Sequence, residues 1–246
     1  CEKGLKPLVL EKGRMVNHVT DYPTMMLDTW ELDHRGALTP NDVQTHHIQV
    51  RSGFVGEATK HFFTNDLENP YQETKRFDWI RGNHVGGRSI TWGKQVYRWS
   101  DHAFEANAKE GIGIDWPIRY KDLAPWYSYV EKFVGVSGEK RGLSHLPDGE
   151  FLPPMEMNCL EKHFRKEVEA KFKNRHVTIG RVAHLTKPQP WHLELGRGQC
   201  QNRNRCSRGC PYGAYFSSNS ATLPAANRTG NFAIRPNSVV HSILFD

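Results

Sequence analysis

The chain has 246 residues, of which 37% are hydrophobic and 24% charged, with a formal net charge of +6. Seven Trp and twelve Phe provide a core, which excludes a disordered chain. No apolar run approaches the roughly 20 residues of a membrane span, and acids and bases alternate without the basic stripe of a nucleic-acid-binding protein. We therefore expect one large or two small globular domains, with no transmembrane segment and no nucleic-acid partner.

The first predicted element is a strand over residues 5–13. It runs through Leu5 and Leu10 and ends in Glu11-Lys12-Gly13, a pattern typical of a buried parallel strand. An acid at the end of a second parallel strand is where a Rossmann unit binds a ribose hydroxyl. Glu11 is therefore a candidate, and an ordinary charged turn is an equal alternative. Both chain ends are abrupt, which favours an internal piece of a longer protein.

Residues 14–80 show little periodicity and are rich in His, Asp, Asn and Thr. A long irregular stretch inside a compact domain usually wraps a partner or covers a site. The pair His46-His47 raises the question of a metal. Polar loop residues are the favoured interpretation, because no acid or thiol lies at a suitable spacing from the pair.

Two adjacent glycines open the run Gly86-Gly87-Arg88-Ser89-Ile90-Thr91-Trp92-Gly93. Because glycine has no Cβ, backbone N–H groups here can approach a bulky anionic ligand closely. Two hydroxyls and an indole follow within a few residues. The run is typical of a segment that lies against a flat cofactor with a phosphate tail. A glycine turn that enters a buried element is an equally weighted alternative.

Helices and strands alternate in the second half of the chain. Tyr127, Val130 and Val134 share one helical stripe, which predicts a helix over about 122–134. Further predictions are an amphipathic helix over 158–173, a strand over 177–186, a polar loop over 187–199, a short helix over 219–227, and strands near 232–235 and 239–245. This mixture places the chain in the α/β or α+β class.

Three of the five cysteines, Cys200, Cys206 and Cys210, lie close together. A disulfide would leave one thiol of the three over and needs an oxidising compartment. Zinc needs a fourth ligand, and none stands nearby at finger or ribbon spacing. A tight thiolate loop with Pro211 after the last Cys is typical of an iron–sulfur site, which the intervening arginines would stabilise. A buried thiol loop without metal is the remaining alternative.

Three motifs, taken in order, resemble the glucose–methanol–choline (GMC) oxidoreductase family. They are the Gly86–Gly93 run, the segment from Asp115-Trp116-Pro117-Ile118 to Pro125-Trp126-Tyr127, and Gly209-Cys210-Pro211-Tyr212-Gly213-Ala214. The branch resembled is that of bacterial sugar and sugar-acid dehydrogenase large subunits. The resemblance implies a discontinuous, Rossmann-like FAD-binding domain with part of a substrate or cap domain. It assigns residues 1–20, 75–145 and 219–246 to the FAD-binding domain, 21–74 to an irregular covering segment, and 146–218 to the substrate or cap region with its Cys-rich loop.

The resemblance also implies which residues bind FAD. Glu11 matches the acid that holds the adenosine ribose, and Val239 or Val240 matches the strand position whose backbone meets the adenine. The segment beside the pyrophosphate, ribityl chain and flavin ring is matched by Gly86, Gly87, Ser89, Thr91, Trp92 and Gly93. Thr91 stands where pyranose oxidases of the family carry a flavin-linking His, so we expect non-covalent FAD.

Two further implications concern the cysteines and the catalytic base. Cys200, Cys206 and Cys210 match a loop that, in the dehydrogenase branch, resembles a three-iron (3Fe-4S) cluster site. The catalytic His, paired with a second His or an Asn, is expected beyond Asp246. The catalytic residues are therefore unknown within this chain.

The activity implied is an FAD-dependent oxidation of a sugar or sugar-acid hydroxyl by hydride transfer to flavin N5. Electrons would pass to a haem or quinone acceptor, with a cytochrome c and a small subunit as partners. The branch often works in the periplasm, which is expected ahead of the cytoplasm. Alternatives are an oxygen-using oxidase with a structural Cys loop, a non-catalytic flavoprotein, and a zinc-stabilised interaction module.

Overall fold

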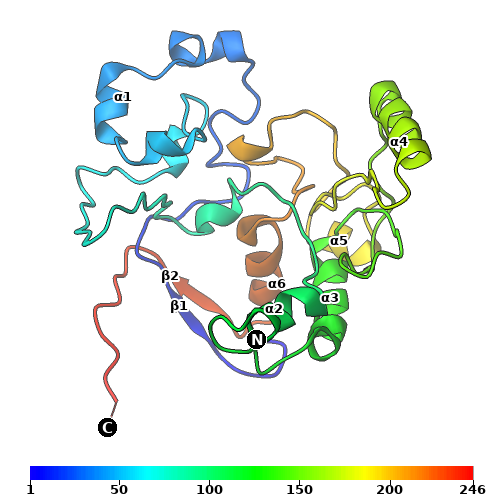
Figure 1. Cartoon of the computed structure of the whole chain (residues 1–246). Helices are drawn as coiled ribbons and strands as arrows, with labels where there is room; N and C mark the ends of the chain where they lie inside the picture. The colour runs from blue at the N-terminus through cyan, green and yellow to red at the C-terminus, as the bar shows by residue number, and fades with distance from the viewer. Residues whose placement is uncertain (246) are drawn as a thin grey trace. The chain divides into compact units, whose positions relative to one another are not determined.

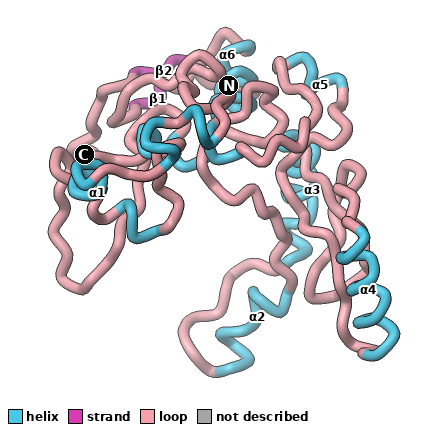
Figure 2. The backbone as a smooth tube through the Cα atoms, turned by 90° about the horizontal axis from the view of Figure 1, so that it is seen from above, coloured by secondary structure: helices cyan, strands magenta, loops and turns pink. Residues whose placement is uncertain are grey.

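The computed structural model describes residues 1–245, which combine short helices with two strands and many loops (Figures 1 and 2). The helices are α1 (Pro40–Thr45), α2 (Asp101–Glu110), α3 (Tyr120–Val134), α4 (Cys159–Lys171), α5 (Pro190–Glu194) and α6 (Leu223–Arg228); the strands are β1 (Leu8–Leu10) and β2 (Ala233–Arg235). This mixed content is compatible with the predicted α/β class. Within residues 1–245, no helix has the length and apolar character needed to cross a membrane.

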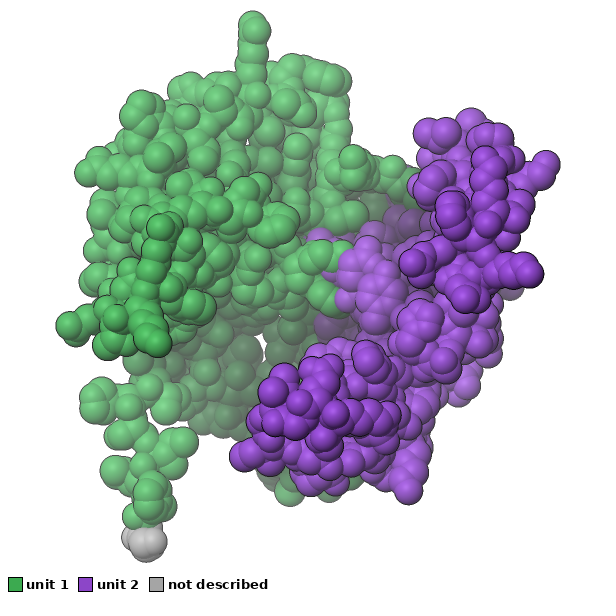
Figure 3. All heavy atoms as spheres, in the orientation of Figure 1, with its two compact units in different colours: residues 1–93, 202–213, 217–246 green, residues 94–201, 214–216 purple. Residues whose placement is uncertain are grey.

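The chain divides into two compact units (Figure 3). Unit 1 comprises residues 1–93, 202–213 and 217–246, and unit 2 comprises residues 94–201 and 214–216. Each unit is thus assembled from stretches that are far apart in sequence. The division passes through the Cys-rich loop, because Cys200 belongs to unit 2 whereas Cys206 and Cys210 belong to unit 1.

The only two strands of the described residues form a parallel pair in unit 1. Leu8 pairs with Ala233 and Leu10 with Arg235. The contact continues beyond the strands, because the backbone N–H of Ser238 donates to the carbonyl oxygen of Glu11 over 2.8 Å. The predicted parallel strand is confirmed over Leu8–Leu10, but its predicted burial is wrong, since Leu8 is 60% exposed.

The core of unit 1 is a cluster of Val16, Tyr22, Phe62, Phe63 and Ile90. Tyr22 and Phe62 meet edge to face with ring centroids 5.9 Å apart, a favourable aromatic geometry. These residues come from loops and single turns, because residues 14–80 contain α1 and several 3-10 turns as their regular structure. The predicted irregular stretch is therefore confirmed, and it supplies much of the core of its unit.

Unit 2 contains α3 and α4, which confirm the helices predicted over about 122–134 and over 158–173. Residues 177–186 do not form the predicted strand. They make isolated bridges instead, in which Val182 pairs with Gln95 and with Ser137. Three helices were not predicted: α1 in the stretch expected to be irregular, α2, of which Phe104 is the buried residue, and the five-residue α5 inside the predicted polar loop.

The strand predicted over 239–245 is also wrong. The strand that pairs with β1 is Ala233–Arg235, close to the other predicted strand, and the segment after it has no regular structure up to residue 245. Val239 is 67% exposed and Leu244 is 91% exposed. An apolar run becomes a strand only where a neighbour accepts its ladder hydrogen bonds, and within residues 1–245 this run has no such neighbour. The short helix predicted over 219–227 is confirmed by α6 and the π-helical turn Ser218–Thr222.

Candidate functional site

Three of the predicted cofactor residues meet in one pocket of unit 1. The pocket has a volume of about 300 Å³ and is lined by Val9, Glu11, Val85, Gly86, Gly87, Ser218, Leu223 and Ile234. It lies where β1 ends and where a helical segment begins at Ser218. Ligands of open α/β sheets bind beyond the carboxyl ends of strands, and helix starts favour phosphate groups. The pocket therefore combines a strand end, a carboxylate, a glycine turn and a helix start.

Gly86 needs to be a glycine for two reasons. Its φ of +92° lies in the left-handed region, which L-residues rarely adopt. A Cβ at this position would also overlap the side-chain oxygen Oδ1 of Asn219. Gly87 follows with φ +46° and opens a 3-10 turn that ends at Ser89. The two glycines thus let the backbone turn close against the helical segment.

Ser89 links the glycine turn to that segment. Its hydroxyl donates to the carbonyl oxygen of Gly86 over 2.6 Å and accepts the backbone N–H of Ser218 over 2.9 Å. Ser89 is not one of the residues that line the pocket. Through these two hydrogen bonds Ser89 orients the glycine turn. Its predicted role in binding a cofactor stays a prediction.

The carboxylate of Glu11, which lines the pocket, is held by a hydrogen bond within its own loop. The N–H of Gly13 donates to its Oε1 over 2.8 Å. A Cβ on Gly13 would overlap the backbone carbonyl of Asn83, so the two segments approach closely here. The N–H of Val85 donates to the carbonyl oxygen of Arg14 over 2.9 Å just beyond. These contacts place the acid and the glycine turn on the same pocket.

Asn219 was missed by the sequence analysis. It is 5% exposed, and its Nδ2 amide donates to the carbonyl oxygens of Val16 over 2.6 Å and Val85 over 3.2 Å. The available signal was the Ser217-x-x-Ser220 capping pattern, in which the hydroxyl of Ser217 accepts the N–H of Ser220 over 3.2 Å. That pattern marks the start of the helical segment and hence the residues that face the turn.

The other predicted residues do not line this pocket. Thr91 is buried, Trp92 is half-buried and Gly93 is exposed. Val239 and Val240 are 67% and 58% exposed and lie beyond β2. Their assignment to flavin and adenine contacts stays a prediction.

His84, two residues before Gly86, is buried, and His61 is half-buried. The two ring nitrogens of His84 lie 3.0 Å from the carbonyl oxygen of Val85 and 3.2 Å from that of Phe62. Burial lowers the pKa of His84, and burial also lowers the pKa of His61 to about 4. The His61 imidazole is therefore neutral at physiological pH. The guanidinium of Arg88 lies 4.8 Å from the ring centroid of Phe63, and burial lowers its pKa as well.

The arginines of the Cys-rich loop bind the backbone of another segment of unit 1. Arg203, Arg205 and Arg208 donate to three consecutive backbone carbonyls, those of Met25, Met26 and Leu27, over 2.6, 2.6 and 2.7 Å. Each bond to a charged donor is of the stronger kind. The loop is thereby fastened to residues 25–27 of unit 1, a role that was not predicted for these side chains.

The predicted iron–sulfur site depends on the state of the thiols and on the grouping of possible ligands within the described residues. All five cysteines are unbridged, and the part of the chain that the structure describes contains no group of three or more His, Cys, Asp or Glu residues placed to hold a metal ion. The structure therefore lends the iron–sulfur cluster no support. Nδ1 of His46 lies 3.0 Å from the carbonyl oxygen of Thr64, a contact in keeping with the favoured interpretation of the pair as polar loop residues.

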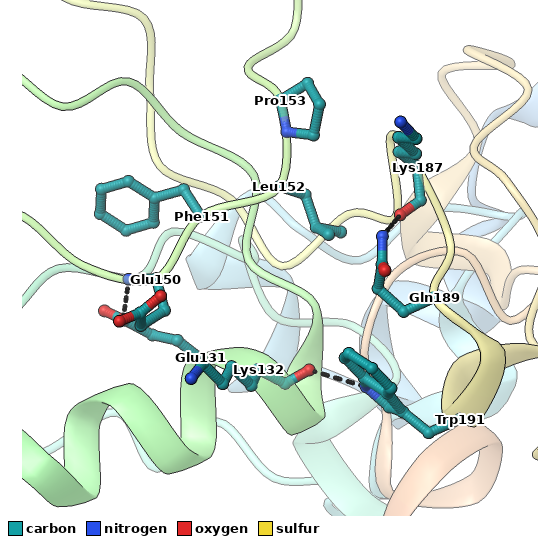
Figure 4. Close-up of a pocket in the computed structure, with 9 residues that line it drawn as sticks. All are labelled: Glu131, Lys132, Glu150, Phe151, Leu152, Pro153, Lys187, Gln189 and Trp191. Atoms are coloured by element: carbon teal, nitrogen blue, oxygen red, sulfur yellow. Dashed lines mark hydrogen bonds between the residues drawn. The ribbon is translucent and has the colours of Figure 1, made fainter.

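A second pocket, in unit 2, is shown in Figure 4. It has a volume of about 340 Å³ and is lined by Glu131, Lys132, Glu150, Phe151, Leu152, Pro153, Lys187, Gln189 and Trp191. The indole N–H of Trp191 donates to the carbonyl oxygen of Lys132 over 3.2 Å, and the N–H of Glu150 to Oε2 of Glu131 over 2.9 Å. No predicted site residue lines this pocket.

Comparison with known proteins points to dehydrogenases. The large subunit of fructose dehydrogenase from Gluconobacter japonicus is 27% identical over 166 residues, which are 66% of this chain and 29% of that protein. A 2-methyl-1,2-propanediol dehydrogenase from Mycolicibacterium austroafricanum is 34% identical over 58 residues, which are 23% of this chain and 10% of that protein. The chain thus spans less than a third of either relative. No family model matches it. The names of these relatives support a general oxidoreductase role.

Proposed function

We propose that the chain is part of an FAD-dependent dehydrogenase of the GMC family that oxidises a hydroxyl of a sugar or sugar acid. The observation that carries the proposal is the unit 1 pocket. It combines an acid after a parallel strand, a double-glycine turn and a helix start, from positions as far apart as Glu11, Gly86 and Ser218. The similarity to two dehydrogenases supports the same reaction class.

The residues of the pocket suit the nucleotide half of FAD. The carboxylate of Glu11 would accept a hydrogen bond from a ribose hydroxyl. The backbone of Gly86 and Gly87, together with the start of the helical segment at Ser218, would face the pyrophosphate. When bound, FAD would supply the hydride-accepting chemistry, while the protein binds and orients it. The chain has Thr91 in place of a flavin-linking His, so the proposed binding is non-covalent.

The finer assignments belong to the same proposal. Residues 1–20, 75–145 and 219–246 would form the FAD-binding domain, and 146–218 the substrate or cap region. Electrons would leave to a haem or quinone acceptor, with a small subunit and a cytochrome c as partners and the periplasm as the compartment. The 3Fe-4S cluster on Cys200, Cys206 and Cys210 is proposed from the resemblance alone, and no step of the reaction is routed through it.

The visible spectrum of the purified protein tests the proposal. We expect a flavin spectrum that survives dialysis, moves to the supernatant on acid precipitation, and bleaches when a sugar or sugar acid is added without oxygen. A colourless protein that also fails to take up added FAD would refute the proposal and favour a zinc-stabilised module. Rapid stoichiometric peroxide formation would point to an oxidase. Iron and acid-labile sulfide assays on the same sample test the cluster separately.

A further inference from the structure

We propose that Asn219 is a positioning residue that sets the geometry of the double-glycine turn and so the shape of the nucleotide pocket. The inference rests on the proposed function, because it concerns the same pocket. Asn219 itself is not among the lining residues. It acts through its neighbours, and its role is separable from that of the residues that would touch FAD.

The first step of the argument is the set of contacts made by the side-chain amide. Its two N–H groups donate to the carbonyl oxygens of Val16 and Val85 over 2.6 and 3.2 Å. Val16 belongs to the segment that follows β1, and Val85 immediately precedes Gly86. One buried side chain on the helical segment therefore holds both of the other segments that build the pocket. The pair of carbonyl partners also fixes the orientation of the amide, since only the nitrogen can donate.

The second step concerns the other end of the amide. Its oxygen Oδ1 is buried and has no hydrogen-bond partner in the described structure. It occupies the space that a Cβ on Gly86 would need. Leaving a buried acceptor without a donor costs free energy. We infer that this cost is offset by the close contact that the oxygen makes with the Gly86 backbone. The oxygen acts as a spacer that defines how closely the Gly86 backbone lies against the helical segment.

The third step concerns Ser89, which makes a second connection between the glycine turn and the helical segment. Ser89 joins the carbonyl of Gly86 to the N–H of Ser218, so two adjacent residues of the helical segment each hold one end of the turn. Removing Asn219 leaves the Ser89 link and β1–β2 pairing in place. We therefore expect a loosened turn in a folded unit, and not a general loss of structure.

The test compares Asn219→Ala and Asn219→Asp with a matched control, Asn227→Ala, which truncates an exposed asparagine of α6. Asn219→Asp keeps the size of the side chain but places a carboxylate against two carbonyl oxygens. FAD affinity is measured by quenching of flavin fluorescence on titration into the deflavinated protein. We expect both Asn219 variants to bind FAD at least about tenfold more weakly, and the control to stay within about twofold.

A double-mutant cycle tests the spacer. Gly86→Ala alone should weaken FAD binding at least about tenfold, because the new methyl group meets Oδ1. In the double variant Gly86→Ala with Asn219→Ala, the truncated side chain leaves room for that methyl group. We therefore expect the loss of affinity in the double variant to be well below the product of the two single losses. If the loss of affinity in the double variant equals the product of the two single losses, Gly86 and Asn219 act independently. That result would overturn the proposal that Oδ1 of Asn219 is a spacer for Gly86.

Hydrogen exchange of the FAD-free protein separates this inference from the proposed function. We expect Asn219→Ala to raise amide exchange at residues 84–90 and leave the segments around Phe62 and β2 protected as before. Uniformly faster exchange throughout unit 1 would make Asn219 an ordinary core residue and overturn the proposal. If the unaltered protein binds no FAD, the proposed function fails, yet the exchange experiment still decides whether Asn219 positions the turn.

Discussion

The buried ion pair of Arg98 and Glu131 gives the most direct test of the energetics of unit 2. Nε of Arg98 donates to Oε1 of Glu131 over 2.8 Å, and Nη2 donates to Oε2 over 2.6 Å. The residues are 6% and 3% exposed. The same guanidinium donates to the hydroxyls of Tyr120 and Ser128, each over 2.9 Å. Hydrogen bonding to Glu131 raises the pKa of Arg98 despite its burial. An arginine guanidinium keeps its proton in proteins even without a partner, so the cation persists when Glu131 is neutralised.

The perturbation is Glu131→Gln, which keeps the size of the side chain but removes its charge. Removing one partner of a buried pair costs about 3–5 kcal/mol, because the other charge stays buried without compensation. We expect a loss of about 3 kcal/mol, since the amide oxygen still accepts one bond. With a urea m-value of about 2 kcal/mol/M, the unfolding midpoint of unit 2 falls by about 1.5 M.

The assay is urea unfolding followed by tryptophan fluorescence, with amide exchange across α3 to assign the transition to unit 2. Glu167→Gln provides the control in the same unit, since Glu167 pairs with Lys171 at the surface, where the side chains are 44% and 68% exposed. That change should cost less than about 1 kcal/mol. Equal losses in the two variants would refute the reasoning that burial makes the Arg98 pair costly to break.

Two further predictions concern acid stability and a helix cap. Burial, with repulsion from Arg14, His84 and Lys60, lowers the pKa of His61 to about 4. The unfolded chain takes up this proton near pH 6.5, so the contribution of a neutral His61 is complete above that pH and is lost as the pH falls to about 4. His61→Gln should therefore reduce the fall in the urea midpoint between about pH 7 and about pH 5, and an unchanged fall would contradict the assignment. Asn158→Ala removes the side chain that accepts the N–H of Glu161 over 2.9 Å at the start of α4. We expect a loss of about 1 kcal/mol, seen as faster amide exchange in the first turn of α4; protection equal to that of the unaltered protein would exclude the cap.

Local patterns predicted α3, α4 and α6 but missed α1, α2 and α5, and the strands predicted over 177–186 and 239–245 did not form. The helical stripe through Tyr127, Val130 and Val134 was enough to locate α3. By contrast, α2 has a single buried residue, Phe104, so little periodic signal exists in its sequence. The run around Val239 and Leu244 has strong β character, yet a strand depends on backbone partners elsewhere in the chain. A local pattern cannot report whether such a partner is present.

The same distinction explains which site residues the sequence revealed. Gly86 and Gly87 stand out because a missing Cβ has a backbone meaning that can be read in place. Glu11 stands out because an acid after an apolar strand has a known chemical use. For Asn219 the capping pattern of Ser217 and Ser220 marks only the start of a helical segment, and does not reveal the contacts of the side chain. Its importance comes from carbonyls 203 and 134 positions away in the sequence, which only the folded chain brings to its side.

The pairing of β1 with β2 has a consequence for how the protein is made. β1 emerges from the ribosome with Leu8, and its partner follows only with Ala233. At a synthesis rate of about 5–20 residues per second, the first strand waits for roughly 10–50 seconds before its neighbour exists. During that interval its apolar side chains and unpaired amides are open to chaperones and to neighbouring nascent chains. The pocket of Glu11 and Gly86 is therefore completed only after β2 has been synthesised, and a ribosome that stalls before Ala233 leaves a product without this wall of the pocket.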